Sequence, residues 1–370
     1  MGCKTIPSDL FVCLNMGKYR RIFLALLLPI QYFGLQWLRP YETVIEQYYS
    51  LGVYPLISTL LRYSFGWIPF SIGDIFYPLL ILLALRWCLK NYRRLRSDSS
   101  GFFLELTGNL AIIYFVFNLI WGLNYLRPPL YKTLQLSPDY TTEELIGLTK
   151  RLAKKSNALH RQLGYPDSVK IDLPYTQERI FELSRVGYER LGEIHPEFDY
   201  RGTSIKSSLW SLGLTYMGYS GYYNPITGEA QVNDRIKNYK FPVVSAHEQA
   251  HQMGFAAENE ANFIATLATI HHPDPYIQYS GSIFALRYCL NEVARRDRAS
   301  YEAFLPQINY GILESYREMR EFWESYKNPF ESISKVFWDQ FLKANHQSQG
   351  IRSYSYMVAL LVQYDRKTPF

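Results

Sequence analysis

The sequence is poor in charged residues and in cysteine. Charged residues make up only 19% of its 370 residues and hydrophobic residues 48%, which excludes a disordered chain and a collagen-like fibre. The four cysteines are scattered and form no CxxC pair; they are Cys3, Cys13, Cys88 and Cys289. This pattern excludes a disulfide framework and a thiolate zinc site. Any bound metal must therefore be held by histidines and carboxylates.

The sequence also lacks a basic stripe, an internal repeat and a low-complexity tract. Its formal net charge is +6, but no run interleaves Lys or Arg with aromatic residues, so we expect no nucleic-acid partner. Aromatic residues make up 16% of the chain. This abundance is typical of a protein that places part of its length at a membrane–water boundary, with membrane lipid as a partner.

Three apolar stretches predict transmembrane helices at about 22–38, 65–85 and 106–126. A signal peptide is the alternative for the first stretch, but Trp37-Leu38-Arg39-Pro40 offers no small-residue cleavage site after it. Asp74 interrupts the second stretch, and we expect it at headgroup depth rather than as a polar contact inside the helix bundle.

The distribution of Lys and Arg predicts the orientation of these helices. Basic residues precede the first stretch and fill the loop between the second and third, whereas the loop between the first and second offers only Arg39 and Arg62, opposed by Glu42 and Glu46. Basic loops remain in the cytoplasm. We therefore expect a multi-pass protein of the cytoplasmic (inner) membrane, with everything after the third helix on the extracytoplasmic side.

The rest of the chain has the composition of a water-soluble domain. We predict a membrane domain over 1–126 and an extracytoplasmic domain over 127–370. Helical spacing of apolar residues predicts helices at about 141–159, 177–191, 276–296, 301–326 and 329–344. The stretch 228–233 follows a turn and alternates in character, which predicts a short edge strand or hairpin.

One motif points to chemistry. The segment His247-Glu248-Gln249-Ala250-His251 follows Pro242 and precedes Gly254, residues that suit the start and the end of a helix. On such a helix His247 and His251 project from one face and can bind one metal ion, with Glu248 beside a metal-activated water. Two satisfied core or surface histidines are the alternative.

A catalytic zinc ion typically has three protein ligands, so a third is expected nearby. The metzincin position holds Ala257, and the next candidates are Glu258 and Glu260 at the start of a second helix. We favour Glu258 and keep Glu260 as the alternative. Asn262 lies one turn after Glu258, where its amide would steady a ligand.

These residues carry a resemblance. His247–His251 followed by Glu258-x-x-Ala261-Asn262 resembles the gluzincin metallopeptidases. The wider pattern, with the run Tyr216–Ala230 and Ser353–Val358, resembles an uncharacterised bacterial membrane family, domain of unknown function 3810. The resemblance implies a mainly α protein in which three transmembrane helices precede an α+β zincin-like metallopeptidase domain with a small edge sheet.

The expected function is that of a membrane-anchored metallopeptidase with one Zn²⁺ ion and Glu248 as general base, acting on a peptide or protein. An edge strand over Gly228, Glu229 and Ala230 would align an extended substrate. Tyr223 and Tyr354 are candidate donors to the oxyanion. The alternatives are a zinc amidohydrolase acting on a non-peptide amide and a catalytically silent zinc-binding membrane protein.

Overall fold

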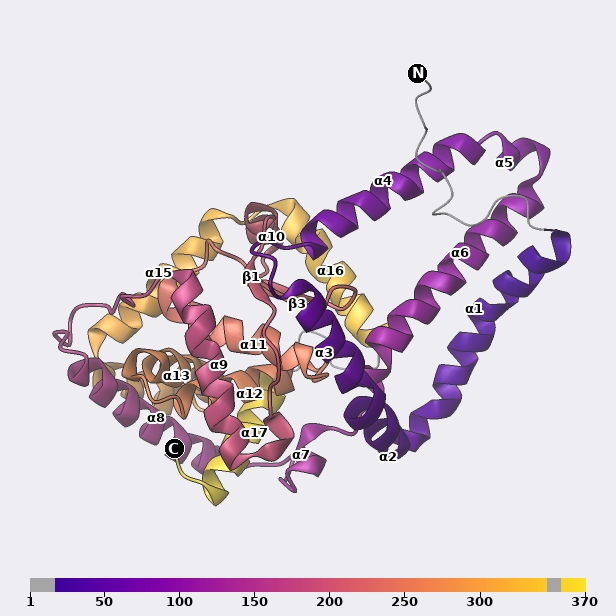
Figure 1. The fold of residues 1–370 in the computed structure, drawn as a ribbon. Coiled ribbons are helices and arrows are strands. Elements are labelled where there is room, and N and C mark those ends of the chain that lie inside the picture. Colours follow the sequence, from indigo (N-terminus) through magenta and orange to yellow (C-terminus); the bar gives the residue numbers. More distant parts are fainter. Residues whose placement is uncertain (1–16, 345–353) are drawn as a thin grey trace. The chain divides into compact units, whose positions relative to one another are not determined.

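The computed structural model describes residues 17–344 and 354–370, and its packing divides the chain into two compact units (Figure 1). The first unit contains the described residues up to Glu42 together with Phe76–Gly122. The second contains Thr43–Ile75 and the described residues from Leu123 onward. The division therefore differs from the predicted boundary at residue 126, because a segment between two apolar helices packs with the C-terminal part of the chain.

The first unit is built on apolar helices. Helix α1 (Lys18–Leu38) packs along α6 (Ser99–Ile120). Arg21 near the start of α1 pairs with Glu105 near the start of α6 at 3.1 Å, so the two helices run in the same direction. The unit also contains most of α4 (Gly73–Asn91) and the short α5 (Arg94–Ser97).

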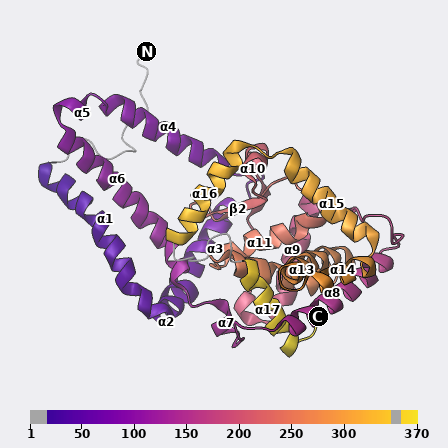
Figure 2. The same cartoon turned by 180° about the vertical axis from the view of Figure 1, so that it is seen from behind.

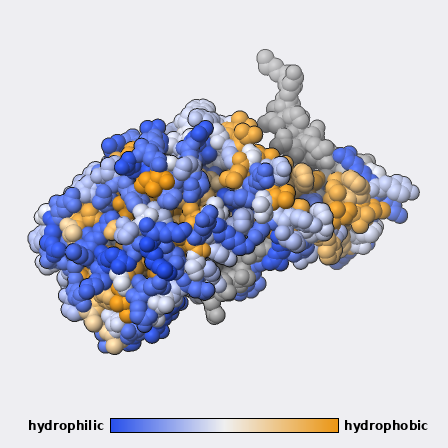
Figure 3. Space-filling model, turned by 90° about the horizontal axis from the view of Figure 1, so that it is seen from below, coloured by the Kyte–Doolittle hydropathy of each residue, from blue (hydrophilic) through white to orange (hydrophobic). Residues whose placement is uncertain are grey.

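Two helical segments of the described chain are long and apolar enough to cross a membrane. They are the continuous helical run Lys18–Phe65 and α6. The prediction of three such helices is thus supported for two, with α4 lying where the second was expected but starting at Gly73 instead of residue 65. Exposed apolar side chains are numerous along these helices, whereas the surface of the second unit is mainly hydrophilic with separate apolar patches (Figure 3).

The second unit contains a three-stranded sheet with the order β1-β3-β2. Strand β3 (Glu229–Val232) is central, with β1 (Ile205–Ser207) parallel on one side and β2 (Gly221–Asn224) antiparallel on the other. The predicted substrate strand Gly228–Ala230 is therefore not an edge, and this prediction is wrong. Glu229 and Ala230 are fully buried because strands pair with both sides of β3.

A helix at the centre of the second unit organises the packing. Helix α11 (Phe241–Gln252) contacts β2 and β3 on one side and α9, α12 and α13 on the others (Figures 1 and 2). Helix α13 in turn packs on α8, and α17 packs on α12. These long helices are α8 (Thr142–Gln162), α9 (Gln177–Ile194), α12 (Glu258–Ile270), α13 (Pro275–Arg296) and α17 (Tyr354–Lys367).

The remaining helices of this unit are shorter or peripheral. They are α2 (Glu42–Val44, which starts at the unit boundary), the π-helix Ile45–Val53, α3 (Tyr54–Phe65), α7 (Leu130–Thr133), α10 (Ser211–Met217), α14 (Arg298–Phe304), α15 (Tyr310–Ser325) and α16 (Pro329–Ala344). The helix expected over 301–326 is thus two helices. Pro306 lies in the 3-10 turn between them, where it cannot supply a backbone donor.

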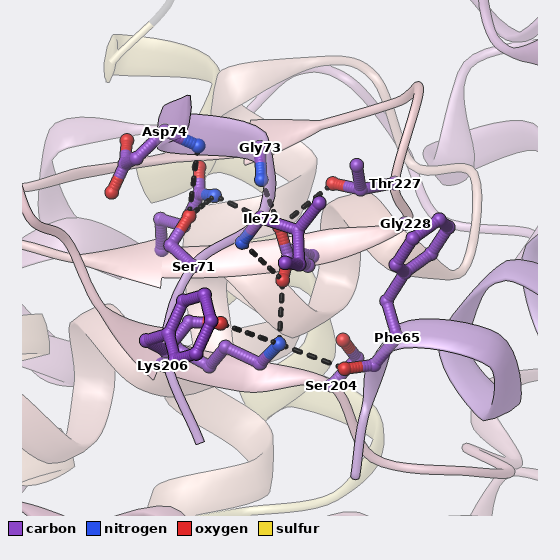
Figure 4. Close-up of polar contacts among 12 residues, drawn as sticks. Phe65, Ser71, Ile72, Gly73, Asp74, Ser204, Lys206, Thr227 and Gly228 are labelled. Carbon is purple, nitrogen blue, oxygen red and sulfur yellow. Dashed lines mark hydrogen bonds and ion pairs between the residues drawn. The ribbon is translucent and has the colours of Figure 1, made fainter. Parts of the chain in front are cut away.

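A buried polar network fixes the segment between α3 and α4 to the sheet. The carboxylate of Glu229 accepts from the backbone N–H groups of Ile72 (3.1 Å) and Gly73 (2.6 Å), and from the ammonium of Lys206 (2.5 Å). Lys206 also donates to the carbonyl of Phe65 at 2.8 Å (Figure 4). Both side chains are at least 95% buried. Each forms hydrogen bonds with several partners, which a buried ion pair needs to offset the cost of leaving water.

Asp74 belongs to the same side of the sheet. Its side chain is 1% exposed and accepts from the Ser208 hydroxyl (3.0 Å), the Leu209 N–H (2.7 Å) and the Tyr222 hydroxyl. The expectation that Asp74 lies at headgroup depth is wrong, because these three donors hold it inside the second unit. The carboxylate thereby joins the first turn of α4 to the loop before α10.

Candidate metal centre

Helix α11 brings two imidazoles together. Pro242 occupies the first turn, where its missing N–H costs nothing, and Gly254 follows the helix end with a φ of 88°. The four-residue spacing places His247 and His251 on one face. Their Nε2 atoms lie 3.1 Å apart. The helix predicted from the motif is present.

The outer nitrogen of His251 has a defined partner. Its Nδ1 lies 2.7 Å from the carbonyl oxygen of Phe255 in the turn after α11. A carbonyl accepts only, so Nδ1 carries the proton and the lone pair of Nε2 points toward His247. Burial, with the charge of His247, lowers the pKa of His251 to about 4, which keeps this imidazole neutral and able to bind a metal ion.

The structure places Glu258 beside both histidines. Its two carboxylate oxygens lie 3.4 Å from Nε2 of His247 and 3.8 Å from Nε2 of His251. Burial raises the pKa of Glu258, but the hydrogen bond from His247 and the charges of both histidines together outweigh it, so the pKa falls below its usual value. The alternative, Glu260, points elsewhere and accepts from the N–H of Leu130 at 2.7 Å.

These residues fit a tetrahedral metal site. Three ligand atoms at zinc-binding distance in a tetrahedron lie roughly 3.3 Å from one another. Here the two imidazole nitrogens lie 3.1 Å apart, and each has a different oxygen of the Glu258 carboxylate nearby, at 3.4 Å from His247 and 3.8 Å from His251. Two imidazole nitrogens and a carboxylate are also the donor set of many catalytic zinc sites. The donors His247, His251 and Glu258 therefore match a divalent cation in both chemistry and spacing.

Glu248 completes a buried cluster with the two histidines. One carboxylate oxygen, Oε2, is buried and has no hydrogen-bond partner within the described ranges 17–344 and 354–370. The other lies against β2, where a Cβ added to Gly221 would be only 2.6 Å from it. Burial raises the pKa of Glu248 to about 8. A carboxyl group with this pKa is mostly protonated at neutral pH, and its ionised form is a stronger base than an ordinary glutamate.

Comparison with known proteins supports the wider resemblance. The family model described as "Protein of unknown function (DUF3810)" matches residues 49–362. The chain belongs to this family. No curated protein and no solved structure matches the chain. The DUF3810 match begins at residue 49 and includes α3, Phe76–Gly122 of the first unit and most of the second unit.

The motif alone did not reveal Lys240. This residue of the DUF3810 chain immediately precedes α11, and its ammonium donates to the Ser220 hydroxyl at 3.0 Å, one residue before Gly221. Burial, with the charge of Arg287, lowers the pKa of Lys240 to about 8, although the charge of Glu248 opposes this shift. The site thus contains a cation that influences the general-base candidate. In the sequence, only the position of Lys240 just before the predicted metal-binding helix could have indicated that it belongs to the site.

Residues of α3 also support the metal helix, and no spacing rule could have found them. The hydroxyls of Tyr54 and Ser58 donate to the carbonyl of Gln252 at 3.1 and 2.6 Å. This carbonyl is among the last four of α11, which lack partners within the helix. The hydroxyl of Tyr54 also lies 3.2 Å from that of Tyr223, which places Tyr223 at the C-terminal end of the metal helix.

The other predicted residues have different outcomes. Asn262 is buried on α12 one turn after Glu258, as the spacing predicts. Tyr354 is the first residue of α17, but its side chain lies outside the described part of the structure. Its role as a donor to the oxyanion stays a prediction.

Proposed function

We propose that this DUF3810 protein is a membrane-anchored, zinc-dependent metallopeptidase. The observation that carries the proposal is the convergence of the His247, His251 and Glu258 donor atoms beside the buried carboxylate of Glu248. A purely structural metal site has no need of such a carboxylate. Its presence favours hydrolysis over a silent metal site.

Each residue has a role in this proposal. A bound zinc ion would act as a Lewis acid and lower the pKa of water toward neutrality. His247, His251 and Glu258 would hold the ion. Glu248 takes the proton of the attacking water and passes it to the leaving amine. The ammonium of Lys240 stabilises the ionised form of Glu248 through its charge.

Strand β2 is suited to bind an extended substrate. It is the outer strand of the sheet beside α11, and its Gly221 lies directly against Glu248. An extended peptide that pairs with this edge would pass next to the general base. This role replaces the one expected for β3, whose two sides are already paired.

The packing of the second unit supports three membrane crossings. Thr43–Ile75 and the residues from Leu123 onward form one compact unit, so they lie on the same side of the membrane. The chain between them must then cross an even number of times. If α6 crosses, α4 crosses too. The basic residues before α1 and between α4 and α6 belong in the cytoplasm, which places the second unit outside the cytoplasmic membrane.

Metal content and turnover test the proposal. The purified full-length chain should contain one zinc ion, and His247→Ala should lose it, whereas His195→Ala, a histidine outside the cluster, should retain it. Glu248→Gln should keep the ion and lose about 10²- to 10⁴-fold in turnover of a peptide library. Equal zinc content in the wild type and His247→Ala would refute the proposal. Cleavage of cell-wall fragments but not peptides would instead support the non-peptide amidohydrolase.

Cysteine labelling tests the orientation. In a cysteine-free background, Arg201→Cys should react in intact cells with a membrane-impermeant maleimide, because Arg201 is highly exposed in the second unit. Ser97→Cys, in the basic loop before α6, should react only after the membrane is opened. The reverse pattern would refute the proposed orientation.

A further inference from the structure

Arg127 contacts the turn that joins the two metal-binding helices. Its guanidinium donates to the carbonyl of Gly254 at 3.1 Å and lies over the ring of Phe255, with its central carbon 4.3 Å from the ring centroid. Phe255 supplies the carbonyl that accepts from Nδ1 of His251. Arg127 therefore acts on the proposed ligand His251 indirectly, through Phe255.

Glu46 holds this arginine in place. Two parallel hydrogen bonds, of 2.6 and 2.7 Å, join its carboxylate to Nε and Nη2 of Arg127. The two side chains are 13% and 9% exposed, respectively, so solvent screens the pair weakly. A planar guanidinium paired in this way has one orientation, and its third nitrogen is directed at Gly254.

The turn depends on contacts from outside because it is short and unusual. Gly254 has a φ of 88°, and an added Cβ would lie 2.9 Å from the ring of Tyr54. Four residues after Gly254 the chain starts α12, whose first residue is Glu258. A shift of this turn would thus move the Phe255 carbonyl and Glu258 together.

We propose that Arg127, fixed by Glu46, is a positioning residue of the metal centre. It holds the Gly254–Phe255 turn so that the Phe255 carbonyl selects the tautomer and ring orientation of His251. The inference rests on the proposed metal site. Loss of a residue that orients a metal-bound histidine typically lowers metal affinity about 10- to 100-fold.

The test compares two identical substitutions. Arg127→Lys keeps the charge but loses the paired hydrogen bonds and the stacking. Arg151→Lys is the control, because Arg151 also makes a two-bond pair with a carboxylate, that of Asp365, away from the turn. For the full-length chain in detergent, we would measure Zn²⁺ affinity by competition with a chromophoric chelator. The visible spectrum of bound Co²⁺ reports ligand geometry at saturation.

We expect Arg127→Lys to bind Zn²⁺ about 10- to 100-fold more weakly and to shift the Co²⁺ spectrum, with Arg151→Lys unchanged in both. Wild-type affinity and spectrum in Arg127→Lys would overturn the inference. So would an equal loss in both variants with an unchanged spectrum, which indicates general destabilisation.

If Arg127→Lys does not fold, Glu46→Gln decides the question by the same two measurements, because it leaves Arg127 in place but weakens its fixation. A wild-type chain that binds no divalent metal would refute the proposed function itself. Metal binding by the wild type with no effect of either variant would refute only the positioning role.

Discussion

The contact between β2 and the general-base candidate gives a sharp prediction for Gly221→Ala. The added methyl group would lie 2.6 Å from Oε1 of Glu248 and 2.7 Å from the backbone carbonyl of Gln231, whereas ordinary contacts begin at 3.4 Å. The backbone of the central strand has little freedom to move. Glu248 would reach an ordinary contact by a shift of about 0.8 Å, the difference between 3.4 and 2.6 Å, whereas the contact with the Gln231 carbonyl strains the pairing of β2 with β3.

We expect a displacement of this size to have a large effect on catalysis, together with a moderate loss of stability from the strained strand pair. Misplacing a catalytic group by about 1 Å can lower the rate about 10²-fold. Overpacking at one site costs about 1–3 kcal/mol. Because Glu248 is not a proposed ligand, we expect Gly221→Ala to keep its zinc ion and to lose about 10²-fold in turnover.

The assay is turnover of a peptide library by the zinc-loaded, full-length chain, together with zinc content and thermal unfolding. Gly213→Ala is the matched control, because an added Cβ there meets nothing within 4 Å and the residue lies within a helix. It should leave turnover unchanged. Turnover of Gly221→Ala within twofold of wild type, with zinc retained, would refute the proposed position of Glu248 in the reaction.

Three further predictions concern stability and metal affinity. Lys206→Met should lower the free energy of unfolding by about 3–5 kcal/mol, measured by denaturant titration, because it leaves the carboxylate of Glu229 buried without its cation. Burial raises the pKa of Glu260 to about 7 from 4.5, so the folded state binds more protons between these values and stability falls as pH rises through this window. Glu260→Gln should weaken that pH dependence in metal-free thermal melts, and an unchanged profile would contradict the assignment. The isolated segment 127–370 lacks the Tyr54 hydroxyl that caps the metal helix, and it should bind zinc more weakly than the full chain in the same chelator competition.

The features that could be predicted from the sequence are those that depend on the spacing of neighbouring residues. Thr141 caps α8 with Glu144 in a reciprocal pair of hydrogen bonds, where the sequence placed a helix start. The spacing of His247 and His251 likewise predicted their common face. Long-range contacts were not predictable in this way. Strand β3 reads as an edge strand because its two partners, which lie on either side of it in space, both precede it in the chain.

The segment Thr43–Ile75 is a second case in which long-range contacts could not be predicted from the sequence. Composition assigned this segment to the membrane domain because apolar helices precede and follow it. Its packing depends instead on hydroxyls and charges that contact the C-terminal part of the same unit, such as Ser58, which donates to a carbonyl 194 residues away. A polar residue within an apolar helix gives no indication of its partner, so the contact becomes visible only in three dimensions.

The charged residues next to the unit boundaries are held by contacts inside the second unit. The chain passes between the units after Glu42, after Ile75 and after Gly122. Within a few residues of these points lie Glu46, Asp74 and Arg127, in that order, and each has buried partners inside the second unit. Glu46 and Arg127 bind each other and hold the turn of the metal site, while Asp74 holds the loop before α10 and, through Tyr222, the strand beside Glu248. Each of these three residues is therefore fixed, within the second unit, to a part of the scaffold that positions a proposed ligand or the proposed base.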